Sequence, residues 1–279
     1  MGKRLTPSML AAFERYLIEN EKSRATVQKY LHDLRHFAAF AANRRADKAL
    51  VLAYKAALET AYTVRSANSM LAALNAFFNF IGWQKYAVKQ FKVQREVYCS
   101  AEKELTKAEY AALIRTAERG KNKRLALVLQ TICATGIRVS ELVFITAEAV
   151  QRGEVMVNCK GKTRKIFIVP SLQKKLMHYI RTQQIKSGCV FVTRSGKPLD
   201  RSNIWREMKA LCEQAGVAPS KVFPHNLRHL FARTFYHLEK DIVKLADVLG
   251  HTNVNTTRIY IMSTGAEHRA KMERLRLVT

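Results

Sequence analysis

The stretch LALVLQTICATGIRVSEL, residues 125–142, decides the fold of the second half of this 279-residue chain. Its first eleven residues are mostly apolar, which is typical of a helix buried in a core. Gly136 is the residue type that most often ends a helix, because glycine adopts the left-handed conformation without a steric penalty. The stretch therefore predicts a buried helix that ends at Gly136 and is followed at once by Arg138.

Downstream, apolar and polar residues alternate over 155–169, with Lys160, Gly161 and Lys162 in the middle. This pattern predicts two strands joined by a turn, with Lys160 at the tip of the hairpin. Helical periodicity then returns in four segments, at residues 171–184, 202–215, 225–238 and 241–249. We expect a mostly helical domain with a small antiparallel sheet.

Upstream, Thr106 and Glu109 have the spacing of a capping box, which predicts the start of a helix over 107–118. Residues 92–104 are charged and show no periodicity. Before them, apolar residues recur at helical spacing, as in 27–37 and 67–81, which predicts a small helical bundle.

These patterns predict a mainly α protein of two domains, a helical one at 1–95 and a second one at 105–279. A short linker at 96–104 joins them. The linker is charged rather than rich in Gly or Ser, so we expect it to be extended without being highly flexible.

The formal net charge of +26 predicts a polyanionic partner, with nucleic acid as the first candidate. Residues 1–100 carry 16 Lys and Arg against 7 Asp and Glu, and residues 101–279 carry 32 against 15. Positive charge on both domains is what a clamp around a DNA duplex needs, because phosphate neutralisation supplies much of the affinity. A generally basic, ribosome-associated protein is the alternative on charge alone.

Five scattered cysteines without a C-x-x-C pair predict reduced thiols that fill the core rather than disulfides. The chain has no apolar run long enough to cross a bilayer, and its basic start lacks the apolar stretch of a secretory signal. We expect a cytoplasmic protein.

Arg138 and Arg228 suit the binding of a phosphate diester, because the planar guanidinium donates two parallel hydrogen bonds and keeps its charge. Two such groups would stabilise the negative charge of a pentavalent transition state. Taken alone, each arginine is more often a surface residue.

A free phenol has a pKa of about 10 and is a poor nucleophile. Tyr260 can therefore act as a nucleophile only if positive charge and a proton acceptor lie nearby. His251 lies nine residues upstream, so turns between the two could bring the imidazole to the phenol. The competing interpretation of Tyr260 is an aromatic residue half-buried in the core.

The leaving group in DNA strand cleavage is a sugar oxygen, which departs more easily when it is protonated. Lys160 at the hairpin tip suits that role, ahead of Lys162 and Lys165. Arg164 is excluded as a proton donor because a guanidinium does not lose its proton in proteins. A turn lysine in water remains the alternative for Lys160.

His225 lies three residues before Arg228, so both share one helix face and could contact the same phosphate. His225 and His229 also have the spacing of helical zinc ligands, but Asn226 stands where such motifs carry glutamate. No ATP site is expected, because the GKT triplet at residues 161–163 lacks the upstream loop glycine. The six residues together indicate DNA strand cleavage through a covalent protein link.

The segments ATGIRVSEL, PHNLRHLFA and LGHTNVNTTRIY, which contain Arg138, His225, Arg228, His251 and Tyr260, resemble the signature boxes of the tyrosine recombinase family. This family is also called the phage integrases, and the chain is most similar to its short Xer-like members. The resemblance covers nearly the whole chain.

The resemblance implies a SAM-like core-binding domain at 1–95 and a catalytic domain at 105–279 that together cleave and rejoin DNA at specific sites. It implies Tyr260 as the nucleophile, Arg138 and Arg228 as a phosphate clamp, and Lys160 as the general acid. His225 and His251 would support acid–base catalysis and phosphate binding. The hairpin segment KGKTRKIFIVP is longer than is usual in the family, so another hairpin lysine could replace Lys160.

The resemblance further implies a 3′-phosphotyrosyl intermediate, no metal or ATP, and a tetramer at synapsis on double-stranded DNA with inverted half-sites, bound by one protomer each. The tail at 264–279 would form a helix that docks on a neighbouring protomer. Two alternatives remain, a type IB-like topoisomerase or resolvase and a non-catalytic DNA-binding protein of the same fold.

Overall fold

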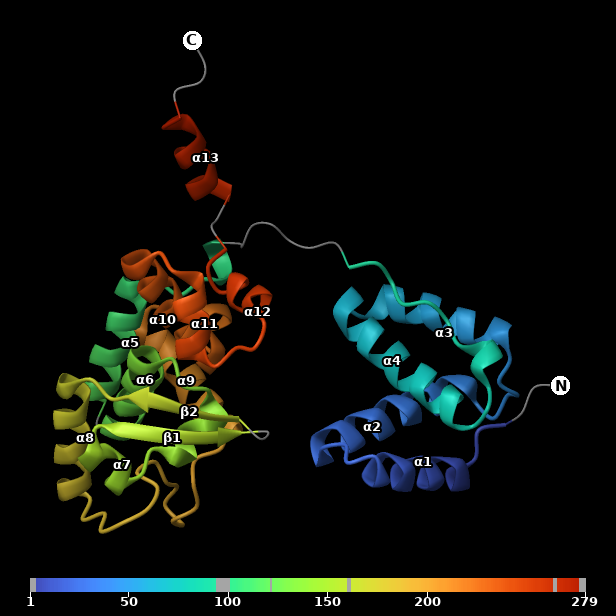
Figure 1. Cartoon of the computed structure of the whole chain (residues 1–279), viewed down its shortest axis with the longest axis horizontal. Helices are drawn as coiled ribbons and strands as arrows, with labels where there is room; N and C mark the ends of the chain where they lie inside the picture. The colour runs from blue at the N-terminus through green and yellow to red at the C-terminus, as the bar shows by residue number, and fades with distance from the viewer. Residues whose placement is uncertain (1–3, 94–100, 121, 160–161, 263–264, 276–279) are drawn as a thin grey trace. The chain divides into compact units, whose positions relative to one another are not determined.

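The computed structural model describes residues 4–93, 101–120, 122–159, 162–262 and 265–275 (Figure 1). The chain divides into two compact units, Met1–Arg95 and Glu96–Thr279. In the part of the chain that the structure describes, no helix is both long enough and apolar enough to cross a membrane.

Over residues 4–93, the first unit is a bundle of four α-helices followed by a short 3-10 helix. Its elements are α1 (Pro7–Glu19), α2 (Arg24–Ala41), α3 (Lys48–Ala61), α4 (Val64–Phe80) and η1 (Gln84–Tyr86). Thr6, Ser23, Asp47 and Thr63 each accept a hydrogen bond from a backbone N–H in the first turn of the helix that follows, which defines where the helices begin. The predicted small helical bundle is confirmed.

Aromatic side chains from several helices fill the core of the first unit. Phe13, Phe37, Phe77 and Phe78 are fully buried, and the rings of Phe13 and Phe77 meet edge to face with their centroids 5.3 Å apart. The hydroxyl of Tyr54 lies 3.0 Å from Nδ1 of His36, so a polar contact accompanies the aromatic packing of α2 against α3.

In its described residues, the second unit is mostly helical and contains one two-stranded sheet. Its first elements are η2 (Ala101–Lys103), α5 (Lys107–Arg119), α6 (Lys123–Thr135), η3 (Val139–Phe144), α7 (Ala147–Arg152), β1 (Glu154–Cys159) and β2 (Lys162–Phe167). They are followed by α8 (Pro170–Thr182), α9 (Arg201–Ala215), η4 (Pro219–Lys221), α10 (Pro224–Glu239), α11 (Ile242–Leu249), α12 (Val254–Arg258) and α13 (Gly265–Glu273). The predicted mainly α class with a small antiparallel sheet is confirmed, and α5 begins at the predicted capping box of Thr106 and Glu109.

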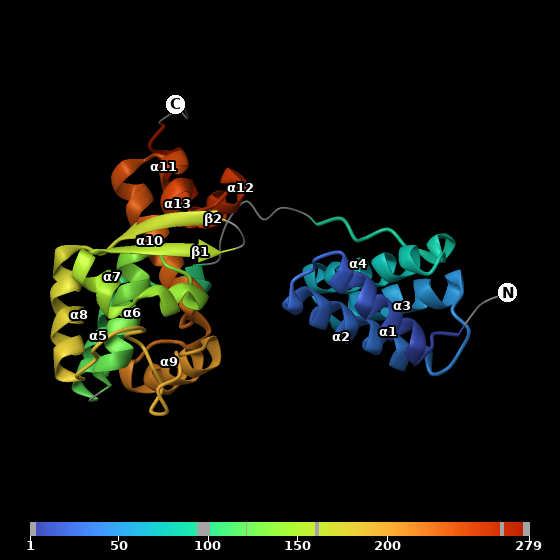
Figure 2. The ribbon, with the colours of Figure 1, turned by 60° about the horizontal axis from the view of Figure 1, so that its bottom comes forward.

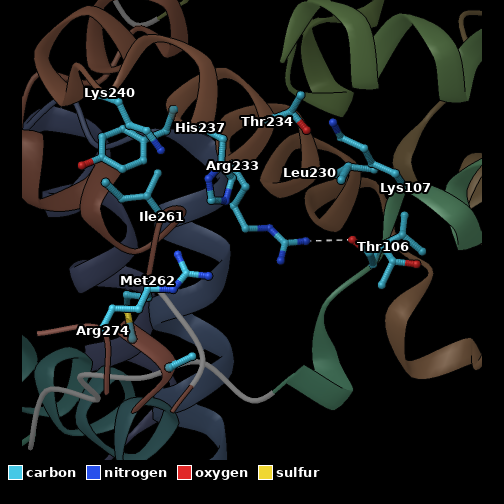
Figure 3. Close-up of a pocket in the computed structure, with 13 residues that line it drawn as sticks. Thr106, Lys107, Leu230, Arg233, Thr234, His237, Lys240, Ile261, Met262 and Arg274 are labelled. Atoms are coloured by element: carbon cyan, nitrogen blue, oxygen red, sulfur yellow. Dashed lines mark hydrogen bonds between the residues drawn. The ribbon is translucent and has the colours of Figure 1, made fainter. Parts of the chain in front are cut away.

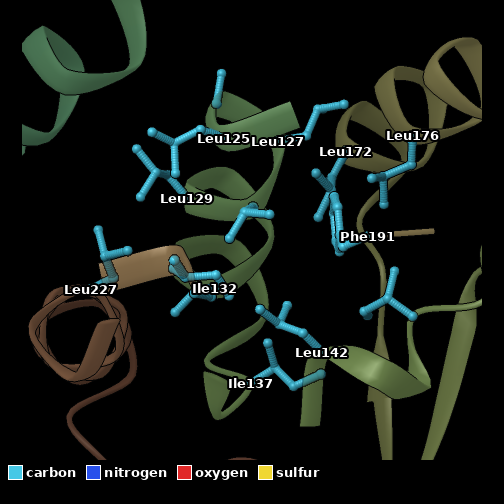
Figure 4. Packing of buried hydrophobic residues seen from close by; sticks show 14 of the residues in the cluster. Leu125, Leu127, Leu129, Ile132, Ile137, Leu142, Leu172, Leu176, Phe191 and Leu227 are labelled. Carbon is cyan, nitrogen blue, oxygen red and sulfur yellow. The ribbon is translucent and has the colours of Figure 1, made fainter. Parts of the chain in front are cut away.

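Helix α6 runs through the core of the second unit and packs against α5, α8, α9 and α10. Leu125, Leu129 and Ile132 of α6 are buried, as are Leu172 of α8 and Leu227 of α10. Figure 4 shows the last two side chains approaching α6 from different sides. The apolar stretch that begins at Leu125 is therefore the central helix, as predicted.

The hairpin presents one face to this core and the other to solvent. Strands β1 and β2 pair in antiparallel register, with Val157 opposite Arg164, and β1 lies beside α7 (Figure 2). Val155, Val157 and Ile166 are buried, whereas Phe167 is 70% exposed. This alternation confirms the predicted strands, and Lys160 at the predicted tip lies outside the described residues.

Cys212 is buried, and Cys133 and Cys189 are partly buried free thiols. These three agree with the prediction that cysteines fill the core, and the side chains of Cys99 and Cys159 lie outside the described part.

Candidate active site

The site begins where α6 ends. Gly136 has φ of +63°, and a Cβ added to it would lie 2.5 Å from a ring carbon of Phe231. A glycine is therefore required here for its backbone conformation and for the close approach of α10. The turn buries Ile137 and places Arg138 at the start of η3.

Glu141 holds two arginines in place. It accepts hydrogen bonds from the backbone N–H of Arg138 at 2.8 Å and from Nη1 of the same residue at 2.9 Å. Nη2 of Arg164, from β2, donates to Oε2 of Glu141 at 2.6 Å, and the same oxygen accepts from the backbone N–H of Arg138. The Glu141 side chain is 2% exposed, whereas that of Arg138 is 39% exposed, so the carboxylate lies beneath a guanidinium that reaches the surface.

These cations keep Glu141 ionised. Burial acts to raise the pKa of Glu141, but hydrogen bonds from Arg138 and the charges of Arg164 and Arg138 outweigh it and lower the pKa. Nη1 of Arg164 also donates to the carbonyl of Val248 at 3.0 Å, and the side chain passes over Gly250, where an added Cβ would lie 2.6 Å from Cδ of Arg164. Arg164 thus joins β2 to the end of α11.

Arg228 of α10 is the largest fully buried side chain among the described residues, at 1% exposure. It donates to the carbonyls of Gly136 and Leu249, which lie at the ends of α6 and α11, and its Nη2 lies 3.0 Å from Nε2 of His251. Burial and the charge of Arg138 lower its pKa to about 10, so it remains a cation at neutral pH.

His251 follows the end of α11 and is held between two partners. Its Nε2 contacts Arg228, and its Nδ1 lies 2.9 Å from Oγ1 of Thr257 on α12. Burial and the charges of Arg228 and Arg138 lower the pKa of His251 to about 4. His251 is therefore neutral at physiological pH.

Tyr260 is 6% exposed and is surrounded by three imidazoles and one guanidinium. Its ring stacks on His229 with centroids 4.2 Å apart, and His225 and His251 each lie at 5.2 Å. The guanidinium carbon of Arg228 is 5.9 Å from the ring centroid. The phenol therefore lies beside Arg228 of its own chain.

Two of the three histidines of α10, His225 and His229, are also neutral at physiological pH. Burial, together with the charges of Arg228, Arg201 and Arg138, lowers the pKa of His225. Burial, together with the neighbouring His225 and Arg228, lowers the pKa of His229 to about 4. In the residues that the structure describes, no group of three or more His, Cys, Asp or Glu is placed to hold a metal ion.

The structure brings together five of the six residues predicted from the sequence. Arg228, His225, His251 and Tyr260 are in direct contact around one phenol, and Arg138 is close enough for its charge to affect the three basic neighbours. Lys160 lies outside the described residues. Glu141 and Thr257 were not predicted from the sequence, and His229 was considered there only as a metal ligand.

A cavity of about 480 Å³ in the same unit contains none of these residues. Leu230 and Arg233 of α10 line it together with Ile261 and Met262, which follow Tyr260 directly (Figure 3). Arg233 donates to the carbonyl of Leu105 at 2.7 Å, which connects α10 to the segment where the chain enters this unit.

Two family models match the chain. The model described as "Phage integrase family" matches residues 103–267, and the model described as "Phage integrase, N-terminal SAM-like domain" matches residues 10–85. The second match confirms the predicted SAM-like fold of the first unit.

The chain is also similar to individual proteins. It is 30% identical to the tyrosine recombinase XerA of Pyrococcus furiosus, in a match that covers 99% of this chain and 96% of that protein. A crystal structure of XerA recombinase matches 99% of this chain and all of that chain, with a TM-score of 0.55 at 23% identity. A lambda integrase(75-356) dimer bound to a COC′ core site matches 94% of this chain and 96% of that chain, with a TM-score of 0.76 at 18% identity.

Proposed function

Because the chain belongs to the phage integrase family of tyrosine recombinases, we propose that it cleaves and rejoins DNA strands at specific sites through a 3′-phosphotyrosyl intermediate. The predicted family and the enzyme class, a tyrosine-type site-specific recombinase, are confirmed by these matches. The observation that carries the proposed chemistry is the position of the Tyr260 phenol beside Arg228, with three neutral imidazoles around it.

In the proposed reaction the Tyr260 oxygen attacks the phosphorus of a DNA phosphodiester. The phenol proton passes to a neighbouring imidazole, and a P–O bond to the phenol forms as the bond to the sugar 5′ oxygen breaks. Lys160 protonates that oxygen as it leaves. Arg138 and Arg228 bind the non-bridging oxygens and stabilise the negative charge of the transition state. The released 5′ hydroxyl of a partner strand reverses these steps, so the ester bond energy is retained without ATP.

The proposed partner is double-stranded DNA with two inverted half-sites, bound by a dimer, with a tetramer at synapsis. The charge of +26 supports a polyanionic partner, and the lambda integrase in the similar structure is a dimer bound to a core site. We place this activity in the cytoplasm. The first unit is the proposed core-binding domain, and the second is the proposed catalytic domain.

A suicide substrate tests the covalent chemistry. The substrate is a duplex that the protein selects from a random pool, nicked near the cleavage point so that the cut fragment diffuses away. We expect the wild-type chain to form a covalent protein–DNA band, and Tyr260→Phe to bind the duplex equally but form no band. A wild-type chain that binds without trapping DNA would indicate the non-catalytic alternative.

A second assay separates recombination from topoisomerase activity. We expect no relaxation of a supercoiled plasmid that lacks the selected site, and strand exchange between two plasmids that each carry it. Relaxation of the plasmid without the site, in the absence of strand exchange, would support the type IB-like topoisomerase instead.

A further inference from the structure

Thr257 is a buried polar residue that the proposed reaction leaves without a role. It lies on α12, three residues before Tyr260, and is 0% exposed. Its hydroxyl oxygen lies 2.9 Å from Nδ1 of His251. Which atom donates in this contact depends on where the imidazole carries its proton.

The contact of the other ring nitrogen, Nε2, shows where the imidazole carries its proton. Nε2 of His251 lies 3.0 Å from Nη2 of Arg228. A guanidinium has donors only, so Nε2 must accept the hydrogen bond and cannot carry a proton. A neutral imidazole then has its single proton on Nδ1, and Nδ1 donates to the Thr257 hydroxyl oxygen.

We propose that Thr257 is a positioning residue: its hydroxyl accepts the Nδ1–H of the tautomer that Arg228 selects, and so holds the His251 ring with its Nε2 lone pair on Arg228, beside the Tyr260 ring. Without the hydroxyl, the partly buried Nδ1–H would lose its acceptor, which carries a desolvation cost. The other tautomer could still accept a hydrogen bond from the Thr257 hydroxyl at Nδ1, but it would place an N–H donor against the guanidinium. Arg228 therefore selects the tautomer, and the Thr257 hydroxyl holds the ring by accepting the hydrogen bond from Nδ1–H.

The proposal rests on the proposed function for its consequence in the reaction. When a DNA phosphate attracts the guanidinium of Arg228, the Nε2 lone pair becomes available to accept the proton of the Tyr260 hydroxyl. The imidazolium that forms keeps its Nδ1–H on Thr257, so the ring need not turn during the transfer. In the wrong tautomer Nε2 carries a proton already and accepts none.

The test begins with the full-length chain free of DNA. Long-range ¹H–¹⁵N correlation spectra of the protein labelled with ¹⁵N-histidine, assigned by comparison with His251→Gln, report which nitrogen carries the proton. At pH 7 we expect His251 to be protonated at Nδ1 in the wild-type chain and in Thr257→Ser. A proton on Nε2 in the wild-type chain would overturn the proposal, and this outcome does not depend on any reaction with DNA.

Three variants then connect the tautomer to the reaction. Thr257→Val keeps the shape and removes the hydroxyl, Thr257→Ser keeps the hydroxyl, and Thr256→Val is the matched control at the exposed neighbouring position. With the suicide duplex, we expect Thr257→Val to bind as tightly as wild type but to cleave about 10- to 100-fold more slowly in a single turnover, as is usual for residues that orient a reacting group. Thr257→Ser should recover most of the rate, and Thr256→Val should match wild type.

The outcomes separate this proposal from the proposed function. A wild-type chain that traps no DNA contradicts the recombinase chemistry and leaves the tautomer measurement intact. A wild-type chain that traps DNA, together with a Thr257→Val variant of unchanged tautomer and unchanged cleavage rate, refutes the role of Thr257. If Thr257→Val does not fold, as judged by circular dichroism, the wild-type ¹⁵N spectrum and the cleavage rate of Thr257→Ser still test the proposal.

Discussion

Replacing Glu141 by Gln is expected to weaken the second unit and to reduce DNA cleavage. The carboxylate is 2% exposed and pairs with Arg138 and Arg164, and removing one partner of a buried ion pair costs about 3–5 kcal/mol. Because the Arg138 side chain is 39% exposed and remains partly hydrated, we take the lower end, about 3 kcal/mol. For a unit of this size that corresponds to a fall in Tm of roughly 6–12 °C.

Differential scanning calorimetry of the full chain measures this fall. The matched control is Glu118→Gln, which alters an exposed pair with Lys175 and should change stability by less than about 1 kcal/mol. Combining Glu141→Leu with Arg164→Met replaces the buried pair by apolar side chains. That double variant should recover much of the lost stability without recovering cleavage, since Arg138 would still lack its partner.

The stability that Glu141→Gln loses relative to the wild-type chain should also depend on pH. The pKa of Glu141 is lowered in the folded chain, so its stabilising effect is complete above the ordinary glutamate pKa of about 4.3 and is lost as the pH falls through the lower folded value. The two proteins should therefore converge in stability at strongly acidic pH. An unchanged Tm at pH 7 together with wild-type cleavage would refute the view that Glu141 organises the arginines.

The remaining predictions concern the histidines, the glycine turn and the tail. The pKa of His229 is lowered to about 4 in the folded chain, so its contribution to stability is complete above pH 6.5 and is lost as the pH falls toward 4. In urea unfolding between pH 6.5 and pH 4, His229→Phe should therefore lose less stability than the wild-type chain. Gly136 and Gly216 share φ of +63°, but only the added Cβ at Gly136 meets other atoms within 4 Å. Gly216→Ala should therefore lower the free energy of unfolding by roughly 1–2 kcal/mol, and Gly136→Ala should lower it clearly more. Equal losses of stability in calorimetry would contradict the predicted clash at Gly136. Deleting residues 266–279 should spare binding to one half-site and weaken cooperative binding to two, and unchanged cooperativity in gel-shift titrations would contradict the docking of the tail.

The elements of the fold were predictable where the signal is local. The helix ending at Gly136 and the alternation around Val157 depend on residues adjacent in sequence, and both are present as predicted. The short helix η3, which carries Glu141, was not predicted, because six residues are too few for a periodic pattern. Glu141 itself had a signal, because it stands three residues after Arg138 in the spacing of a capping box.

The convergence of the site was not predictable from spacing. Gly136 and Arg228 are 92 residues apart in the chain and are joined by a hydrogen bond, and Arg164 reaches Val248 across 84 residues. Such contacts depend on the packing of whole helices, so no periodicity indicated them. The resemblance to a family indicated which side chains share the site, but not these contacts. The contact between His251 and Thr257 has no signal of its own, because many threonines stand six residues from a histidine without touching it.

Arg228 closes the carbonyl ends of two helices with the same group that is proposed to bind the scissile phosphate. A protein that no longer cleaves DNA can lose the Tyr260 hydroxyl through a change to Phe at little structural cost, because the packed ring remains. Losing the Arg228 guanidinium would instead leave two buried carbonyls unsatisfied. Descendants that survive as inert DNA binders should therefore retain Arg228 long after Tyr260 has drifted. The presence of this arginine in a sequence therefore indicates the fold, whereas the presence of the tyrosine indicates cleavage activity.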